Sequence, residues 1–146
     1  MQRRNLALQK DLQAIEGAHE LVQHMYQQCQ GRIAVASGAD RFKVEMVLNQ
    51  VGLMTYFQGR VFSGHEMARS KPHPDVYLAA AQHLQVMPAR CLVIEDSVAG
   101  VQAGVAAGVT VWGYAALGQG AQLRQAGARL VFADMAQLHK NAAAAN

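Results

Sequence analysis

The chain has 146 residues, of which 51% are hydrophobic and 16% charged, and its formal net charge is +3. This length allows one well-buried core and is too short for two comfortable domains. The basic residues are scattered rather than gathered on one helix face, which argues against nucleic-acid binding, and mild basicity equally suits a protein that handles anionic small molecules.

Membrane and secretory classes are also disfavoured. No apolar run approaches the roughly 20 residues of a membrane span. The N-terminus lacks the apolar segment of a signal peptide. Cys29 and Cys91 stand far apart without zinc-site or disulfide spacing, and we interpret them as reduced, buried thiols. We therefore expect a cytoplasmic protein that associates with neither membrane nor nucleic acid.

The first part of the chain predicts two helices and a buried strand. Scattered leucines over residues 5–14 predict a marginal helix, and apolar side chains on one face predict a second over residues 18–29. Gly17 and Gly31 are expected to end them. The run IAVAS at residues 33–37 has the length and composition of a buried parallel strand.

Another helix and strand follow. Asp40 is expected to cap a helix that runs to Gln50. The apolar positions expected to pack this helix on the core are Phe42, Val44, Met46, Val47 and Leu48. Residues 59–64 predict a strand, and the prolines of KPHPD at 71–75 fix the backbone before a helix over residues 76–84.

The last part of the chain continues the alternation. Strands are predicted at 91–94, 109–114 and 129–132, and helices at 98–107 and 135–139. Gly100, Gly104 and Gly108 recur on one helix face and predict close packing on the sheet. The alanine-rich residues 141–146 predict a disordered tail. The alternation as a whole favours an α/β fold with a doubly wound parallel sheet.

Four polar side chains follow predicted strands: Ser37, Lys71, Glu95 and Asp96. Because the carboxyl ends of parallel strands meet at one edge, we expect these side chains to converge. Two adjacent carboxylates where a buried strand ends call for a cation, and oxygen ligands suit Mg²⁺. Taken singly, these residues also have ordinary interpretations. Ser37 could be a turn serine and Lys71 a solvated loop lysine, and Asp96 or Ser97 could cap the following helix.

Three segments together resemble the haloacid dehalogenase superfamily. ASGAD at 36–40, SKPHPD at 70–75 and VIEDSVAGVQAGVAAG at 93–108 are similar to its second, third and fourth motifs, in the same order and spacing. The similarity is greatest to the sugar-phosphate phosphatase and β-phosphoglucomutase branch, and it runs from about Ala14 to Val131. It implies a Rossmann-like core and Mg²⁺-dependent phosphoryl transfer through an aspartyl-phosphate.

The resemblance also implies residue roles. Ser37 and Gly38 bind the phosphoryl group, with a hydrogen bond from the Ser37 hydroxyl, and Lys71 neutralises charge between that group and the nucleophile. Glu95 and Asp96 hold Mg²⁺ directly or through water.

One family motif is missing. The first motif, an Asp-x-Asp that supplies the nucleophile and the general acid/base, occurs nowhere in this sequence. The resemblance therefore implies a truncated chain that lacks the first strand and most of the helical cap. Residues 1–16 are expected to be a cap or linker remnant, 17–140 an incomplete core and 141–146 a tail. Loss of the first strand is expected to leave two unpaired inner edges, through which the chain could self-associate.

Two functions stay open. The first is a Mg²⁺-dependent phosphatase of a small phosphorylated metabolite, with a phosphomutase as its variant. Without the nucleophile, this chain is expected to be inactive alone. The second is a non-catalytic remnant that binds phosphate or a partner protein.

Overall fold

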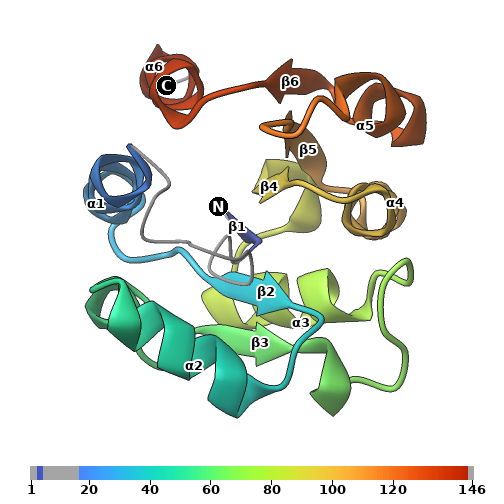
Figure 1. Ribbon diagram of the computed structural model, residues 1–146. Helices are drawn as coiled ribbons and strands as arrows, with labels where there is room; N and C mark the ends of the chain where they lie inside the picture. The colour runs from blue at the N-terminus through green and yellow to red at the C-terminus, as the bar shows by residue number, and fades with distance from the viewer. Residues whose placement is uncertain (1–2, 5–16, 145–146) are drawn as a thin grey trace.

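The protein has an α/β architecture with two parallel sheets of three strands each, in the orders β1-β2-β3 and β4-β5-β6 (Figure 1). The structure is a computed structural model, and it describes residues 3–4 and 17–144. The strands are β1 (Arg3–Arg4), β2 (Val35–Ser37), β3 (Val61–Ser63), β4 (Leu92–Glu95), β5 (Thr110–Tyr114) and β6 (Leu130–Phe132). The α-helices are α1 (Ala18–Gln28), α2 (Arg41–Gln50), α3 (Asp75–Leu84), α4 (Val98–Ala107), α5 (Gly120–Ala126) and α6 (Met135–Ala144). Short 3-10 helices are η3 (Met54–Tyr56), η4 (Gly64–Glu66) and η5 (Pro88–Arg90).

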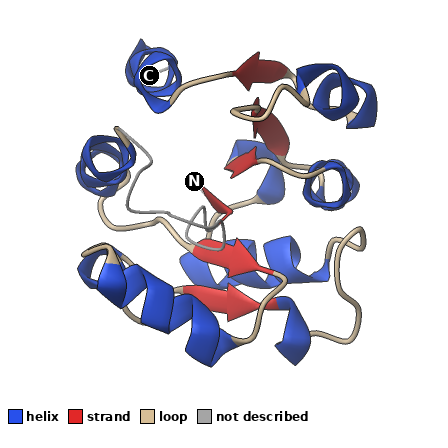
Figure 2. Ribbon diagram, in the orientation of Figure 1, coloured by secondary structure: helices blue, strands red, loops and turns tan. Residues whose placement is uncertain are grey.

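Helices cover both faces of the strands (Figure 2). Helices α1, α2 and α6 share one hydrophobic core with the strands, and α3, α4 and α5 share the other. Successive strand residues face opposite sides. Ile94 and Trp112 accordingly lie in the first core, whereas Val93 and Val111 lie in the second. The predicted doubly wound, parallel α/β fold is confirmed.

The N-terminal strand β1 corrects one expectation. Arg3 pairs with Val35 and Arg4 with Ala36, so the inner edge of β2 is not left unpaired. On its other side β1 lies beside β4 (Figure 1). Backbone donors and acceptors are supplied by every residue except proline, so two residues without a strand signature can satisfy this edge. The remainder of the predicted segment 1–16, including the helix over 5–14, lies outside the described residues.

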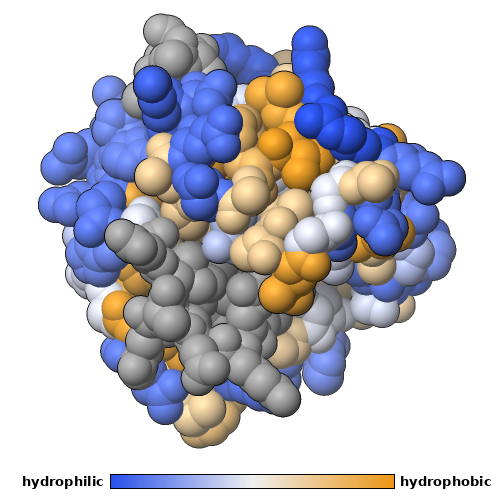
Figure 3. Space-filling view, turned by 45° about the horizontal axis from the view of Figure 1, so that its top comes forward, coloured by the Kyte–Doolittle hydropathy of each residue, from blue (hydrophilic) through white to orange (hydrophobic). Residues whose placement is uncertain are grey.

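Helix α2 shows where the pattern of apolar residues was misleading. As predicted, Asp40 caps this helix, with its Oδ1 accepting a hydrogen bond from the Lys43 N–H at 2.9 Å. Val44 and Leu48 are buried, but the Phe42 side chain is 78% exposed. Met46 is exposed as well, so the prediction that Phe42 and Met46 pack on the core is wrong. On the face shown in Figure 3, hydrophobic residues likewise reach the surface between hydrophilic ones.

The C-terminal region holds two further differences. Helix α5 was not predicted, because Leu123 is the one side chain in it that is buried. Helix α6 continues to Ala144, and Ala142 is only 2% exposed within the first core. Residues 141–144 therefore extend the last helix where a disordered tail was expected, since alanine favours helix.

The two cysteines differ in burial: Cys91 is buried as predicted, whereas Cys29 is only partly buried. Neither Cys29 nor Cys91 forms a disulfide, and burial raises the pKa of the Cys91 thiol. Within residues 3–4 and 17–144, no helix combines the length and hydropathy that a bilayer span requires.

Candidate active site

The Lys71 ammonium joins the ends of two strands. Its Nζ donates to the carbonyl of Ala36 in β2 at 3.3 Å and to Oε2 of Glu95 in β4 at 3.1 Å. The lysine side chain is only 10% exposed and that of Glu95 is fully buried. The structure therefore brings the lysine loop and the ends of both strands together, as the sequence analysis expected.

Glu95 has hydrogen-bond donors on both carboxylate oxygens. Oε2 accepts from the Lys71 ammonium and from the Tyr77 hydroxyl, the latter at 2.5 Å. Oε1 accepts from the backbone N–H groups of Asp96 and Ser97 at 3.0 and 3.2 Å, and from the Ser97 hydroxyl at 3.2 Å. A carboxylate without water is costly to bury unless it is paired and hydrogen-bonded, and Glu95 is both.

Gly100 provides the space that Glu95 occupies. A Cβ at Gly100 would lie 1.9 Å from Cδ of Glu95, which no packing adjustment tolerates without moving the carboxylate. Gly104, one turn later, also lies close to the sheet, since its Cβ would meet Cγ2 of Val111 at 2.5 Å. Gly108 does not pack this closely, because the nearest atom to its Cβ would be Cβ of Pro88 at 4.0 Å. The predicted close packing is confirmed at Gly104, and at Gly100 the glycine accommodates a buried acid.

Ser37 is the last residue of β2, and Gly38 begins the loop that follows. Ser37 is fully buried, and its Oγ accepts a hydrogen bond from the Ala39 N–H at 3.1 Å. A hydroxyl that accepts one bond still carries a hydrogen to donate. A Cβ at Gly38 would find no atom within 4 Å, so there is open space beside this loop. The loop therefore has room for an anion beside the Ala36 carbonyl, to which the Lys71 ammonium donates.

Asp96 lies where β4 ends, partly exposed. Gln119 orients its backbone by donating from Nε2 to the Asp96 carbonyl at 3.1 Å. Burial, together with the negative charges of Asp134 and Asp96, raises the pKa of the nearby Tyr114 hydroxyl. Asp96 thus places a negative charge at the same end of the sheet.

The acidic side chains at the end of β4 supply only part of a Mg²⁺ site. The described residues contain no group of three histidine, cysteine or acidic side chains placed to hold a metal ion. Glu95 is fully buried and both of its oxygens accept hydrogen bonds, whereas Asp96 is partly exposed, so Asp96 is the better candidate for a direct ligand. Proteins commonly hold Mg²⁺ by one or two carboxylates plus substrate phosphates and waters. A site built on Asp96 therefore needs phosphate oxygens to be complete.

An ion pair fixes the loop that leads to Lys71. Arg41 in α2 donates to Glu66 through Nε at 3.0 Å and Nη2 at 2.7 Å. The hydrogen bond from Arg41 lowers the pKa of Glu66. Further along the loop, Arg69 pairs with Asp75 at 3.1 Å. An exposed pair contributes little stability, so the effect of these contacts is chiefly to orient the loop.

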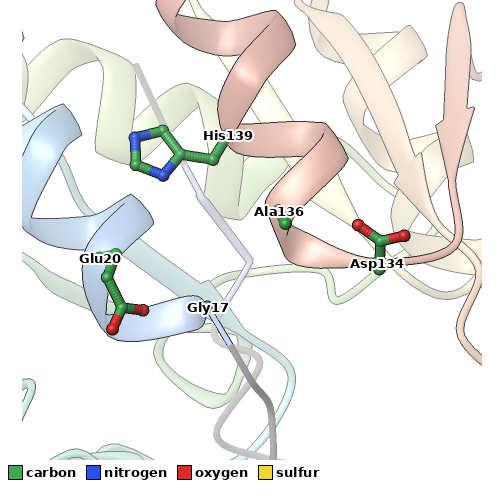
Figure 4. A pocket seen from close by; sticks show the side chains of 5 residues that line it. All are labelled: Gly17, Glu20, Asp134, Ala136 and His139. Carbon is green, nitrogen blue, oxygen red and sulfur yellow. The ribbon is translucent and has the colours of Figure 1, made fainter.

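A separate cavity of about 540 Å³ lies between the starts of α1 and α6 (Figure 4). Its lining residues are Gly17, Glu20, Asp134, Ala136 and His139. None of the residues predicted to bind phosphate is among them. Two carboxylates would also repel a phosphate, so the cavity does not replace the Lys71 region as candidate site.

Two neighbours of Glu95 were missed by the sequence analysis. Tyr77 appeared there only as part of a helix, and Gly100 only as a packing glycine. The spacing of Gly100 from Glu95 offered a signal, but the contact of Tyr77 with Glu95 depends on how α3 packs against β4. That packing is not encoded in any local pattern.

Known proteins are similar to this chain in sequence and in fold. A profile of the haloacid dehalogenase-like hydrolase family matches residues 2–108. A 6-phosphogluconate phosphatase of Escherichia coli is 32% identical over 106 residues, which make up 73% of this chain and 46% of that protein. The crystal structure of a hydrolase of this family from Deinococcus radiodurans, with bound phosphate and sodium, has 36% identity and a TM-score of 0.82. That match covers 90% of this chain and 59% of the other.

A β-phosphoglucomutase from Clostridium difficile has the same fold, with 24% identity, a TM-score of 0.68, and coverage of 90% of this chain and 58% of that one. The chain thus spans between 46% and 59% of the length of these three proteins. The family profile covers more than half of the chain and includes all three motifs. The resemblance read from the motifs is confirmed: this chain belongs to the haloacid dehalogenase-like hydrolase family.

Proposed function

We propose that this chain carries the phosphate-binding part of a Mg²⁺-dependent phosphatase, whose substrate is a small phosphorylated metabolite such as a sugar phosphate. The supporting observation is the Lys71 ammonium, held 3.1 Å from Glu95 and 3.3 Å from the carbonyl that precedes Ser37. A fixed cation beside a loop with hydroxyl and backbone donors suits the charge on phosphoryl oxygens. The 6-phosphogluconate phosphatase supports the substrate class.

Each site residue has one role in this proposal. Ser37 donates its hydroxyl hydrogen to a phosphoryl oxygen, and Gly38 leaves room for that oxygen. Lys71 offsets the negative charge of the phosphoryl group. Asp96 would hold Mg²⁺ directly. Glu95, whose two buried oxygens already accept hydrogen bonds, orients Lys71. When bound, Mg²⁺ would neutralise charge on the phosphoryl oxygens.

The covalent step needs a nucleophile from outside these residues. In the route that family membership implies, an aspartate carboxylate outside this chain's described residues attacks phosphorus as the P–O bond to the substrate alcohol breaks. The second aspartate of the same motif, as general acid, gives the leaving alcohol its proton. Water then hydrolyses the aspartyl-phosphate. The sequence contains no Asp-x-Asp, so we propose that this chain binds phosphate without turnover when it is alone.

A non-catalytic phosphate-binding domain is the second candidate. The pairing of β1 with β2 favours it, because this sheet edge is satisfied without an aspartate-bearing strand. The reading frame upstream of Met1 distinguishes the candidates: a strand ending in Asp-x-Asp there supports the phosphatase. A cytoplasmic location and self-association through strand edges remain predictions of the sequence analysis.

Calorimetric titration with inorganic phosphate in the presence of MgCl₂ tests the site. We expect Lys71→Met to weaken phosphate binding at least about tenfold, because a hydrogen bond to a charged group contributes about 1.5–3 kcal/mol. Lys71→Met combined with Glu95→Gln avoids leaving a buried charge unpaired and should show the same loss. Asp96→Asn should remove the gain in affinity that MgCl₂ provides.

The matched control is Lys140→Met, which removes an exposed lysine on α6 and should leave phosphate affinity unchanged. A p-nitrophenyl phosphate assay run in parallel should show no turnover. The proposal is wrong if the folded wild-type chain does not bind phosphate, or if both lysine substitutions weaken binding equally.

A further inference from the structure

We propose that Tyr77 is a positioning residue, which acts through Glu95 to set where the Lys71 ammonium lies. This inference rests on the proposed function, because it assigns a residue to the same phosphate site. The carrying observation is the hydrogen bond of 2.5 Å from the Tyr77 hydroxyl to Oε2 of Glu95, the same oxygen that accepts from Lys71 at 3.1 Å.

Because both groups donate to Oε2 of Glu95, the Tyr77 hydroxyl can influence the position of the Lys71 ammonium. Oε2 has a limited number of lone-pair directions, and the Tyr77 hydroxyl takes one of them. The Lys71 ammonium is thereby restricted to another direction, in which it also reaches the Ala36 carbonyl. Without the hydroxyl, the ammonium could move into the vacated position, deeper against Glu95 and away from the Ser37 loop.

The Tyr77 ring contributes a second contact with the same lysine. Lys71 Nζ lies 4.9 Å from the centre of the ring, within the range of a cation–π interaction. The tyrosine is fully buried on α3, so its hydroxyl and ring are held in place by the surrounding core. The ring therefore constrains the ammonium directly, and the hydroxyl constrains it through Glu95.

Packing is the ordinary alternative, since Tyr77 also belongs to the core formed with α3 and α4. Tyr77→Phe separates the two explanations. This substitution keeps the ring, its packing and the cation–π contact, and it removes only the hydroxyl that meets Glu95. A purely structural tyrosine would lose stability on this change without any effect specific to Lys71.

The test measures inorganic phosphate affinity by calorimetry for Tyr77→Phe in two backgrounds. In the otherwise wild-type chain we expect affinity to fall about fivefold to tenfold, the effect of one lost hydrogen bond. In the Lys71→Met, Glu95→Gln background we expect Tyr77→Phe to change affinity by less than about twofold, because the groups through which it acts are absent. Tyr26→Phe on α1, where the tyrosine is 36% exposed, is the matched control and should have no effect.

A second readout does not require phosphate. In ¹H–¹⁵N spectra of lysine ammonium groups, the Lys71 signal is identified by its absence in Lys71→Arg. We expect its hydrogens to exchange with water at least about fivefold faster in Tyr77→Phe than in the wild type. Unchanged exchange, or an equal loss of affinity in both backgrounds, would overturn the role of Tyr77. Failure of the folded wild type to bind phosphate would instead overturn the proposed function, and the exchange rates would still decide the role of Tyr77.

Discussion

At the scale of single residues, Glu95 has the most demanding environment in the candidate site. Its carboxylate is fully buried, and its stability depends on one cation, one tyrosine and the donors at the start of α4. Removing one partner of a buried ion pair costs far more than an exposed pair contributes. Residues that have no chemistry of their own, such as Gly100, are therefore essential to the site because they make room for the acid.

Gly100→Ala tests this dependence. The added methyl would lie 1.9 Å from Cδ of Glu95, so the carboxylate has to move. We expect a loss of about 1–3 kcal/mol in the free energy of unfolding, even though alanine favours helix more than glycine does. Phosphate affinity should fall as well, because Lys71 moves with Glu95. Urea unfolding and calorimetry measure the two effects.

Gln102→Ala supplies the control for Gly100→Ala, since Gln102 is exposed on the same helix and its substitution should change stability by less than about 0.5 kcal/mol. Wild-type stability and phosphate affinity in Gly100→Ala would show that the space at Gly100 is not needed.

At the scale of elements, α2 illustrates how a helix is held by few side chains. Val44 and Leu48 lie one turn apart and both are buried in the first core. Phe42 lies two residues before Val44, Met46 lies midway between Val44 and Leu48, and both reach the surface. Because neighbours on a helix face are three or four residues apart, the two pairs occupy different faces of the same helix.

The two faces of α2 should respond differently to truncation. Leu48→Ala is expected to lower the free energy of unfolding by about 2–5 kcal/mol, because it leaves a cavity in the core. Met46→Ala removes a side chain of similar size that is 42% exposed, and is expected to cost less than about 1 kcal/mol. Thermal and urea unfolding of both variants measure the difference. Similar losses in the two variants would mean that α2 packs through another face.

At the scale of the whole molecule, the strands form two three-stranded sheets in which β2 and β5 are central. The central strands have hydrogen-bonded neighbours on both sides, and β3 and β6 form outer edges. Local opening is easiest where backbone groups are least enclosed. In each sheet, the backbone hydrogen bonds of the central strand are therefore expected to open less often than those of the outer strand.

Hydrogen exchange of backbone amides measures this order. The amides of β5 should exchange more than about tenfold more slowly than those of β6, and the amides of β2 more slowly than those of β3. The comparison within each sheet serves as its own control, because solution conditions are identical. Faster exchange in β2 than in β3 would contradict the pairing of β1 with β2.

The sequence by itself determined the family and the order of most strands and helices, with β1 and α5 as the exceptions. Alternating apolar runs placed α1, α2, α3 and α4 and every strand after the first, because burial of one face imposes a period on the sequence. The motifs around Ser37, Lys71 and Glu95 predicted where the candidate site lies, because side chains after parallel strands collect at one edge.

Only the tertiary structure decided which segments pair, which apolar side chains are buried and which side chains contact one another. Strand β1 forms through backbone pairing alone, which leaves no side-chain signature. Phe42 and Leu48 are both apolar, and the position of α2 on the sheet decides which one is buried. The hydrogen bond from Tyr77 to Glu95 joins residues of α3 and β4, elements that meet only when the chain is folded. Local patterns report periodicity and composition, whereas contacts between distant segments depend on how the complete set of elements packs.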